Sequence, residues 1–282
     1  MTVIINPSTS AIEAIARIVA KGAAPALPAT EFVRAVLSQL SLEDFELQGQ
    51  TDWVRILSSM LQASQQRARG LASVRVNQDS TSIEEGGSPR STLEIVSDDL
   101  PFLVDSFKMT LDRLGISCHA IVHPVLSVTR SAQGELESLP GPIKESVVWM
   151  EIERQSSESA EALCAALRST LEDVRVSVED WQMMRDKMLE VADIAAGQQI
   201  HNGETDTSEA HDFLFWASDN HFTFLGFREY RLSGSGENES LEPVPGSGLG
   251  LLRDGHHSAS PRPVNSLGRK QSLRQELLIL TK

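Results

Sequence analysis

The first seventy residues place apolar side chains three and four positions apart, which is the spacing of amphipathic helices. Thr30 can cap one such run, and a second run begins at Trp53. The apolar positions of the two runs are Phe32, Val33, Val36, Leu37, Leu40, Trp53, Ile56, Leu57, Met60 and Leu61. This pattern predicts a helical N-terminal segment over residues 1–70.

Strand-like patterns dominate residues 71–178. Apolar residues alternate around Val74 and again around Leu93, which predicts two strands joined by a polar loop. The period is also two over residues 116–129, where one face is apolar and the other more polar, and alternation returns over residues 148–152. One covered and one more polar face predicts an antiparallel sheet with helices on one side.

Two helices are predicted between and after these strands. Asp98 and Asp99 form a start signal as acidic caps, with Pro101 in the first turn. Gly115 supplies the stop, and a second helix is expected over residues 160–174. Strands and helices in this order predict an α+β fold, a two-layer sandwich of sheet and helices.

The pattern after Val174 fits two structures. Helical spacing continues and favours a helical linker over residues 179–207. Alternating valines leave a short closing strand as the alternative.

A second α+β unit is expected to begin at residue 208 and to be incomplete at residue 282. It should contain a helix through Trp216 and a strand over residues 221–232. Residues 233–268 are rich in Gly, Ser and Pro, which indicates a flexible stretch. Residues 277–282 look like a strand.

Charge narrows the classes of partner. The 282 residues carry 39 Asp and Glu against 25 Lys and Arg, a formal net charge of -14, and the acidic excess lies after residue 70. Nucleic acid and anionic membranes would repel such a chain, so neither is expected as a partner. No membrane helix or secretory signal is visible, and Cys118 and Cys164 lie in apolar patterns that fit a reducing compartment. A cytoplasmic location is expected.

Candidate chemistry is sparse. Gly246, Gly248 and Gly250 lack the preceding strand and the third-glycine spacing of a dinucleotide loop, so we interpret them as a flexible surface loop. His119 and His123 are expected on one face of a strand, too far apart to bind one metal ion without further ligands. No serine or cysteine lies in a nucleophile motif. We therefore assign no catalytic, metal-binding or cofactor-binding residue.

Five segments occur in an order that matches one known family. They are Asp98–Ser106, His119–Leu126, Leu171–Arg175 with Val178–Trp181, Asp219–Tyr230 and Gly246–Arg253. Together they resemble the N-terminal part of the large bacterial NAD-dependent glutamate dehydrogenase. The resemblance covers most of the chain, from about residue 30 onward.

The resemblance implies a parent protein that is a cytoplasmic, homo-oligomeric oxidoreductase of amino-acid catabolism, converting L-glutamate, NAD and water to 2-oxoglutarate, ammonia and NADH. Residues 71–178 would be a first ACT-like regulatory module, and residues 208–282 the start of a second. NAD and the catalytic residues would lie downstream, so residues 1–282 are expected to be a non-catalytic fragment that binds no cofactor. The implied partners are other copies through the ACT-like modules, the downstream catalytic domains and an amino-acid effector.

One departure from the family pattern concerns the first strand-to-helix loop. Amino-acid-binding ACT modules have a glycine soon after the loop proline, where this chain has Phe102. A phenylalanine does not favour positive φ and would crowd a ligand, which favours packing between modules there. The candidate regulatory or interface residues are Asp98, Asp99, Pro101, Phe102, His119 and His123. A free-standing amino-acid sensor and an interaction scaffold remain the alternative functions.

Overall fold

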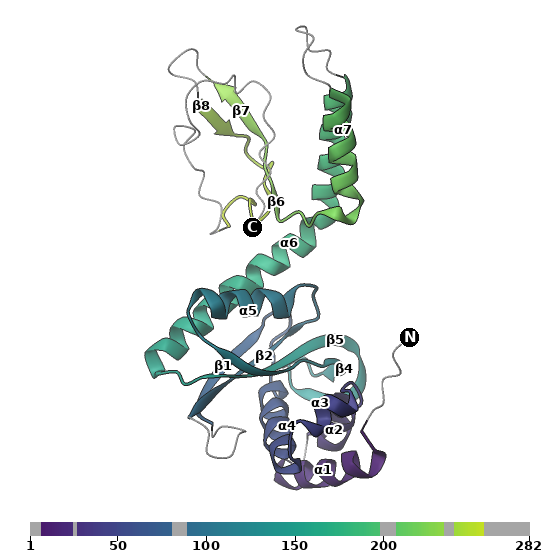
Figure 1. Cartoon of the computed structure of the whole chain (residues 1–282), viewed down its shortest axis with the longest axis vertical. Coiled ribbons are helices and arrows are strands. Elements are labelled where there is room, and N and C mark those ends of the chain that lie inside the picture. The colour runs from purple at the N-terminus through teal and green to yellow at the C-terminus, as the bar shows by residue number, and fades with distance from the viewer. Residues whose placement is uncertain (1–6, 25–26, 81–88, 198–206, 234–239, 257–282) are drawn as a thin grey trace. The chain divides into compact units, whose positions relative to one another are not determined.

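The computed structural model describes residues 7–24, 27–80, 89–197, 207–233 and 240–256 (Figure 1). The chain divides into two compact units, residues 1–171 and residues 172–282. The division falls within one long helix, α6 (Ser157–Gly197), so that each unit contains part of it. We describe each unit by itself.

The N-terminal segment is helical, as its sequence pattern predicts. It contains α1 (Thr9–Gly22), α2 (Ala29–Leu37), α3 (Leu42–Glu46) and α4 (Gln50–Ser64). The predicted cap at Thr30 is wrong, because α2 begins at Ala29 and Pro28 occupies the cap position. Proline is favoured at helix starts because it has no N–H group to leave unpaired there.

An antiparallel sheet forms the centre of the first unit. Its strands are β1 (Ser73–Ser80), β2 (Arg90–Asp98), β3 (Cys118–Val122), β4 (Val125–Arg130) and β5 (Leu136–Glu153). The order is β1-β2-β5-β3, and β4 also pairs with β5. The alternating pattern of residues 116–129 does not form one continuous strand: it breaks between Val122 and Val125, where Pro124 has no N–H group for a ladder hydrogen bond.

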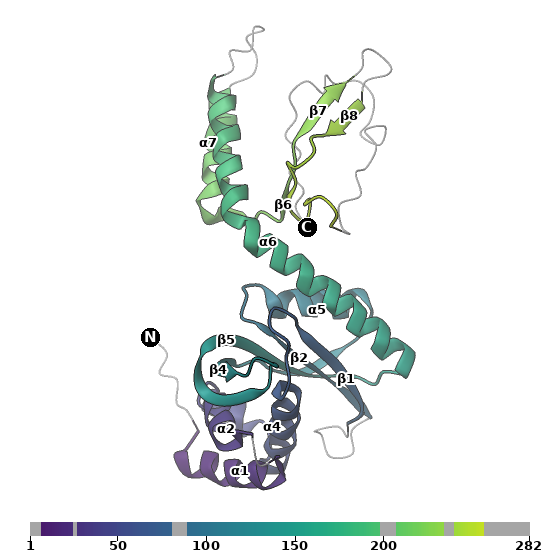
Figure 2. The same cartoon turned by 180° about the vertical axis from the view of Figure 1, so that it is seen from behind.

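Two helical segments cover one face of this sheet, α5 (Leu103–Arg113) and residues 157–171 of α6 (Figures 1 and 2). The hydroxyl groups of Thr110 on α5 and Thr170 on α6 are 2.8 Å apart, within hydrogen-bond distance. The stop at Gly115 is confirmed, since this glycine has φ +69° just after α5. The predicted start is wrong: Asp98 is the last residue of β2, and the helix begins at Leu103.

The N-terminal helices cover the opposite face of the sheet, so both faces are buried (Figures 1 and 2). Phe32 of α2 and Trp53 of α4 belong to the same apolar core as Val96 of β2 and Trp149 of β5. The expectation that helices cover only one face is corrected by this core. The neighbouring residues Ile95 and Val148 are also buried and, because side chains alternate along a strand, point to the other face.

Buried carboxylates fasten α4 to the sheet. Glu94 of β2 is 2% exposed, accepts a hydrogen bond from the Ser59 hydroxyl of α4, and lies 2.8 Å from Nε of Arg75. The Arg75 guanidinium also donates to the Ser59 carbonyl oxygen. A buried charge is tolerated only when it is paired and hydrogen-bonded, and this pairing joins helix and sheet.

A larger ionic group lies where α4 ends, and we call it the Glu145 network: Arg67, Asp98, Arg130 and Glu145. Glu145 is fully buried, and Arg130 donates to both of its carboxylate oxygens, at 2.6 and 2.7 Å. Arg67 donates to Glu145 at 2.9 Å and to Asp98 at 2.7 Å. Arg130 also donates to the Ser64 carbonyl at the end of α4. The network therefore links one helix to three strands.

The second unit contains residues 172–197 of α6, α7 (Thr207–Trp216) and the π-helical turn η1 (Ala217–His221). Two short ladders follow: β6 (Gly226–Phe227) with β9 (Leu249–Gly250), and β7 (Tyr230–Ser233) with β8 (Ser240–Pro243). Met188, Ala192 and Leu214 form its small apolar core.

Predictions for the second unit have mixed outcomes. The continuation of helix past Val174 is confirmed, and no closing strand forms within residues 157–197. The helix through Trp216 is confirmed, but the strand predicted over residues 221–232 is limited to β6 and the start of β7. The strand predicted over residues 277–282 lies outside the described residues. Among the helices that the structure does describe, none combines the length and apolar character needed to cross a membrane.

Candidate functional site

The loop between β2 and α5 holds a strained residue. Phe102 occupies the cap position of α5 with φ 67° and ψ 6°, the left-handed region that bulky residues rarely adopt. Its side chain is 52% exposed, so the ring does not fill the loop. The expectation that Phe102 would avoid positive φ is therefore wrong. Strained backbone that persists in a fold commonly marks a functional segment, which keeps this loop a candidate site.

The two aspartates of this loop have different roles. Asp98 belongs to the Glu145 network through its ion pair with Arg67. Asp99 is exposed, and one carboxylate oxygen accepts a hydrogen bond from the Ser146 hydroxyl of β5 at 2.9 Å. Neither side chain caps α5, which has no side-chain cap hydrogen bond. Asp99 thus remains at the surface, where a ligand or neighbouring module could reach it.

Ser146 joins Asp99 to His123 in a chain of hydrogen bonds. The Ser146 oxygen lies 3.0 Å from Nε2 of His123 and donates its own proton to Asp99, so Nε2–H is the donor toward Ser146. A serine used as a nucleophile would instead donate to the histidine. Burial lowers the pKa of His123 below its usual value. The nearby Asp99 carboxylate acts to raise this pKa, but its effect is the smaller of the two. The arrangement therefore positions a neutral imidazole beside a carboxylate rather than forming a catalytic triad.

His119 lies apart from this chain of hydrogen bonds. Its Nε2 is 2.6 Å from Nη1 of Arg90, so the ring nitrogen accepts from the guanidinium. β3 has a bulge between Cys118 and Ala120 and ends at Val122, so His119 lies in the strand and His123 in the connection that follows it. Throughout the ranges that the structure describes, no group of three or more His, Cys, Asp or Glu side chains could hold a metal ion.

The glycine-rich turn of the second unit is tightly held, in contrast to the surface loop expected from its sequence. The carboxylate of Asp180, on α6, accepts a hydrogen bond from the Gly250 N–H at 2.7 Å and two from Arg253, at 2.8 and 3.1 Å. Burial acts to raise the pKa of Asp180, but the hydrogen bonds from Arg253 and Gly250 outweigh it and leave the pKa below its usual value. This turn is therefore occupied by a carboxylate of its own chain.

Close packing explains the glycines of this turn. Gly250 has φ +57°, and a Cβ atom there would lie 2.3 Å from the Leu225 carbonyl oxygen. At Gly248 a Cβ atom would lie 2.1 Å from the Leu252 oxygen. Both positions exclude a side chain because backbone passes directly beside them.

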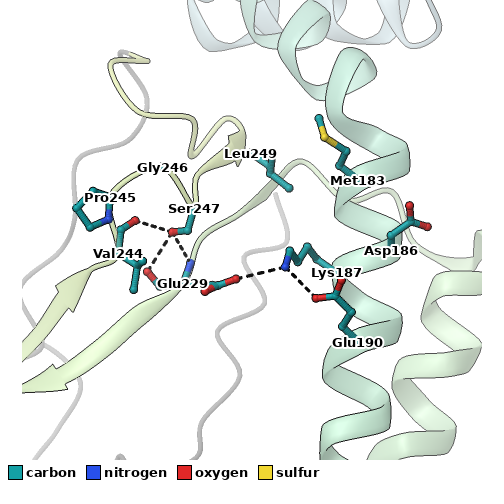
Figure 3. A pocket seen from close by; sticks show the side chains of 10 residues that line it. All are labelled: Met183, Asp186, Lys187, Glu190, Glu229, Val244, Pro245, Gly246, Ser247 and Leu249. Atoms are coloured by element: carbon teal, nitrogen blue, oxygen red, sulfur yellow. Dashed lines mark hydrogen bonds and ion pairs between the residues drawn. The ribbon is translucent and has the colours of Figure 1, made fainter.

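An open cleft of about 470 Å³ lies beside this turn in the second unit (Figure 3). Lys187 projects into it from α6 and pairs with Glu190 at 2.8 Å and with Glu229 at 3.6 Å. The opposite wall contains Ser247, whose hydroxyl accepts from the Glu229 N–H and donates to the Val244 oxygen. Opposite charges side by side suit a small zwitterionic ligand better than a nucleotide, whose phosphates the carboxylates would repel.

The two cysteines are free thiols in partly buried positions. Burial raises the pKa of Cys118 and of Cys164 above the usual thiol value. Because the thiolate is the reactive form, neither cysteine is set up as a nucleophile.

Sequence reasoning missed several residues that organise these sites. Ser146 and Glu145 lie within a strand and were not singled out. Two adjacent polar residues directly before an apolar run were a signal that could have identified them. Asp180 and Arg253 both lie in segments that carry the family resemblance, but only the tertiary structure shows that they pair.

The fold of the first unit is that of an ACT-type α+β module extended by N-terminal helices. Residues 32–167 match the family model described as glutamate dehydrogenase, ACT1 domain. These residues belong to that domain family.

The relatives are named NAD-specific glutamate dehydrogenase. The chain is 33% identical over 237 residues to the protein from Pseudomonas aeruginosa, covering 81% of this chain and 15% of that relative. It is 32% identical over 181 residues to the protein from Halomonas elongata, covering 60% of this chain and 11% of the relative. A third relative, from Mycobacterium tuberculosis, is 27% identical over 183 residues, again 60% of this chain and 11% of the relative. The chain is thus similar to the N-terminal part of these enzymes and spans a small share of their length.

Proposed function

We propose that this chain is the N-terminal regulatory and oligomerisation region of a cytoplasmic NAD-dependent glutamate dehydrogenase and is non-catalytic by itself. The observation that supports this most is the match to NAD-specific glutamate dehydrogenases over 81% of the chain but only 15% of the Pseudomonas aeruginosa relative. The parent protein would convert L-glutamate, NAD and water to 2-oxoglutarate, ammonia and NADH. The ACT1 match supports the regulatory part of the proposal.

The chemistry of the described residues agrees with placing NAD and catalysis elsewhere in the parent. The glycine-rich turn presents the Gly250 N–H to Asp180, so a phosphate would have to displace a buried carboxylate. Ser146 is fully buried and donates to Asp99. The glycine-rich turn and Ser146 are the features most similar to a nucleotide loop and a catalytic triad. In both, the polar groups already form hydrogen bonds with carboxylates of this chain.

The regulatory role is assigned to the loop of Asp99 and Phe102 together with His123. The strained, exposed Phe102 presents its ring to a neighbouring module or effector, and Asp99 and His123 supply a carboxylate and an imidazole at the surface. Contact with a neighbouring module or effector would bury the Phe102 ring, and this burial would offset the backbone strain at Phe102.

The test compares residues 1–282 with the full protein encoded by the same reading frame. NADH formation from glutamate and NAD is expected for the full protein and not for residues 1–282. Within the full protein, Phe102→Ser is expected to change the oligomeric mass or the response to a panel of amino acids. Met109→Ser is the matched control, because Met109 is 51% exposed on α5, the helix that follows Phe102. NADH formation by residues 1–282, or a frame that ends at residue 282 without dehydrogenase domains, contradicts the proposal.

A second candidate is a free-standing amino-acid sensor, and the cleft of the second unit favours it. Lys187 could hold a carboxylate group, while Glu190 and Glu229 could hold an ammonium group. This function predicts a rise in melting temperature of residues 1–282 with one amino acid of the panel, which Lys187→Met abolishes. A flat response across the panel counts against it.

A further inference from the structure

Helix α7 carries its largest side chains on the outside. Leu214 of α7 and Ala217 at the start of η1 are buried, whereas in α7 Phe213 is 44%, Phe215 57% and Trp216 46% exposed. A surface helix usually turns its apolar stripe inward and its polar face outward. Here Leu214 faces the small apolar core of the second unit, whereas the aromatic side chains stay partly exposed although they contact neighbouring rings.

The turn after α7 enlarges this surface. Asn220 adopts φ 61°, which reverses the chain and returns Phe222 to the side of Trp216. Ring centroids are 6.0 Å apart for Phe213 and Trp216, and 5.7 Å for Trp216 and Phe222, the latter pair edge to face. The His221 ring stacks on Trp216 at 4.4 Å. We call Phe213, Trp216, His221 and Phe222 the aromatic patch.

Hydrogen bonds hold the aromatic patch in place. Nε of Arg185, on α6, donates to the Ser218 oxygen at 2.8 Å, and the Ser218 hydroxyl donates to the Phe215 oxygen at 2.7 Å. Nδ1 of His221 donates to the Trp216 oxygen at 2.8 Å. The patch is therefore preorganised, which lowers the entropy cost of binding a partner.

The charges around the aromatic patch decide between partners. Residues 207–222 contain Glu209, Asp212 and Asp219 but no Lys or Arg. Glu209, Asp212 and the patch residue Trp216 follow helical spacing and share a side of α7. A second copy of this chain would bring the same three carboxylates against them and a net charge of -14, so like charges would oppose self-association here. The occupant should have an apolar centre and a basic rim.

We propose that the aromatic patch is a docking surface for an apolar, Lys- and Arg-rimmed surface in the remaining polypeptide of the parent dehydrogenase. This inference rests on the proposed function, because it requires that the chain be part of a longer protein. The Pseudomonas aeruginosa relative has most of its length outside the region matched here, which provides ample chain to cover the patch. Buried aromatic side chains are the residues that most often dominate such interfaces.

The experiment places the photocrosslinking amino acid p-benzoylphenylalanine at position 216 of the full-length protein. The expected cross-link joins position 216 to a peptide of the same polypeptide beyond residue 282 that contains Lys or Arg. Asp212→Lys is expected to reduce the yield of this cross-link at least fivefold. Glu161→Lys is the matched charge reversal, on an exposed position of α6 in the first unit, and should leave the yield unchanged.

Three outcomes overturn the inference: no cross-link, a cross-link to residues 1–282 of the same or a second copy, or equal loss of yield in both charge reversals. Amide hydrogen exchange over residues 207–222 gives an independent measurement, since docking should slow exchange at least tenfold in the full protein relative to residues 1–282. Equal exchange overturns the inference. NADH formation by the same preparation tests the proposed function separately, so an active enzyme with an uncovered patch refutes only the docking.

Discussion

Glu145→Gln is the sharpest test of how the first unit is held together. The substitution keeps the size of the side chain but removes the charge that Arg67 and Arg130 share. Both arginine side chains are nearly inaccessible, at 3% and 4%, so water cannot replace the lost partner. The partly exposed Asp98 carboxylate would be the one remaining negative charge of the network beside two buried cations, with neutral acceptors from the glutamine amide and backbone oxygens.

The expected loss follows from the burial of this network. Removing one partner of a buried ion pair typically costs about 3 to 5 kcal/mol, whereas a whole domain is stable by roughly 5 to 15 kcal/mol. For a unit of this size each kcal/mol corresponds to about 2 to 4 °C, so the melting temperature should fall by roughly 6 to 20 °C.

Urea unfolding followed by tryptophan fluorescence measures the change, because Trp53 and Trp149 are both buried in the first unit. Glu13→Gln is the control: Glu13 pairs with Arg34 at 2.7 Å on the surface, and its loss should leave the unfolding midpoint unchanged. The reasoning is refuted if Glu145→Gln loses less than about 1 kcal/mol, the value expected of an exposed pair.

Four further predictions concern single residues. Gly250→Ala should destabilise the second unit by at least about 2 kcal/mol in urea unfolding, since it combines positive φ with a 2.3 Å clash. Asp180→Asn should cost about 1 to 3 kcal/mol and accelerate hydrogen exchange of the Gly250 amide. In the folded state the pKa of His123 lies below 6.5, so the unfolded chain takes up a proton at this position first. The free energy of unfolding should therefore fall as the pH drops through 6.5. His123→Gln should flatten this pH dependence of the unfolding free energy between about pH 7 and 5. Burial raises the pKa of Cys118, so iodoacetamide should modify it more slowly than free cysteine at neutral pH, as measured by mass spectrometry.

Each of these predictions has a contrary result. Gly246 also has positive φ but open space around it, so Gly246→Ala should cost less than Gly250→Ala, and equal losses would contradict the packing argument. Unchanged exchange at Gly250 would show that Asp180 does not hold the turn. A pH dependence that survives His123→Gln would assign it to another group. Rapid modification of Cys118 would mean that the thiol is accessible.

Local pattern was sufficient where one segment decides its own structure. The helices of the N-terminal segment, the stop at Gly115 and the helix through Trp216 all follow from apolar spacing or from one glycine. The resemblance to glutamate dehydrogenase rested on short segments, and the ACT1 match confirms it. Such features depend on neighbours in the sequence, which a single chain displays directly.

Long-range pairing could not be obtained in this way. In the sequence, Glu145 and Glu94 look like residues on the solvent-facing side of a sheet. In the structure they are covered and pair with arginines, Glu145 with Arg67 and Glu94 with Arg75. Asp180 and Arg253 are 73 positions apart, and their ion pair converts an apparently open glycine loop into a packed turn. Phe102 has a positive φ that its own side chain disfavours, so the surrounding fold must impose it.

By itself the sequence determined the fold class, the family and the absence of a recognisable nucleotide-loop motif, because these depend on local spacing and short motifs. Only the tertiary structure decided that the sheet is covered on both faces, that the glycine-rich turn is closed by Asp180, and that α7 presents aromatic rings outward. The physical reason is that burial and charge pairing are properties of surfaces brought together from distant parts of the chain. The same residue is a polar surface group or a buried ionic partner depending on what packs against it.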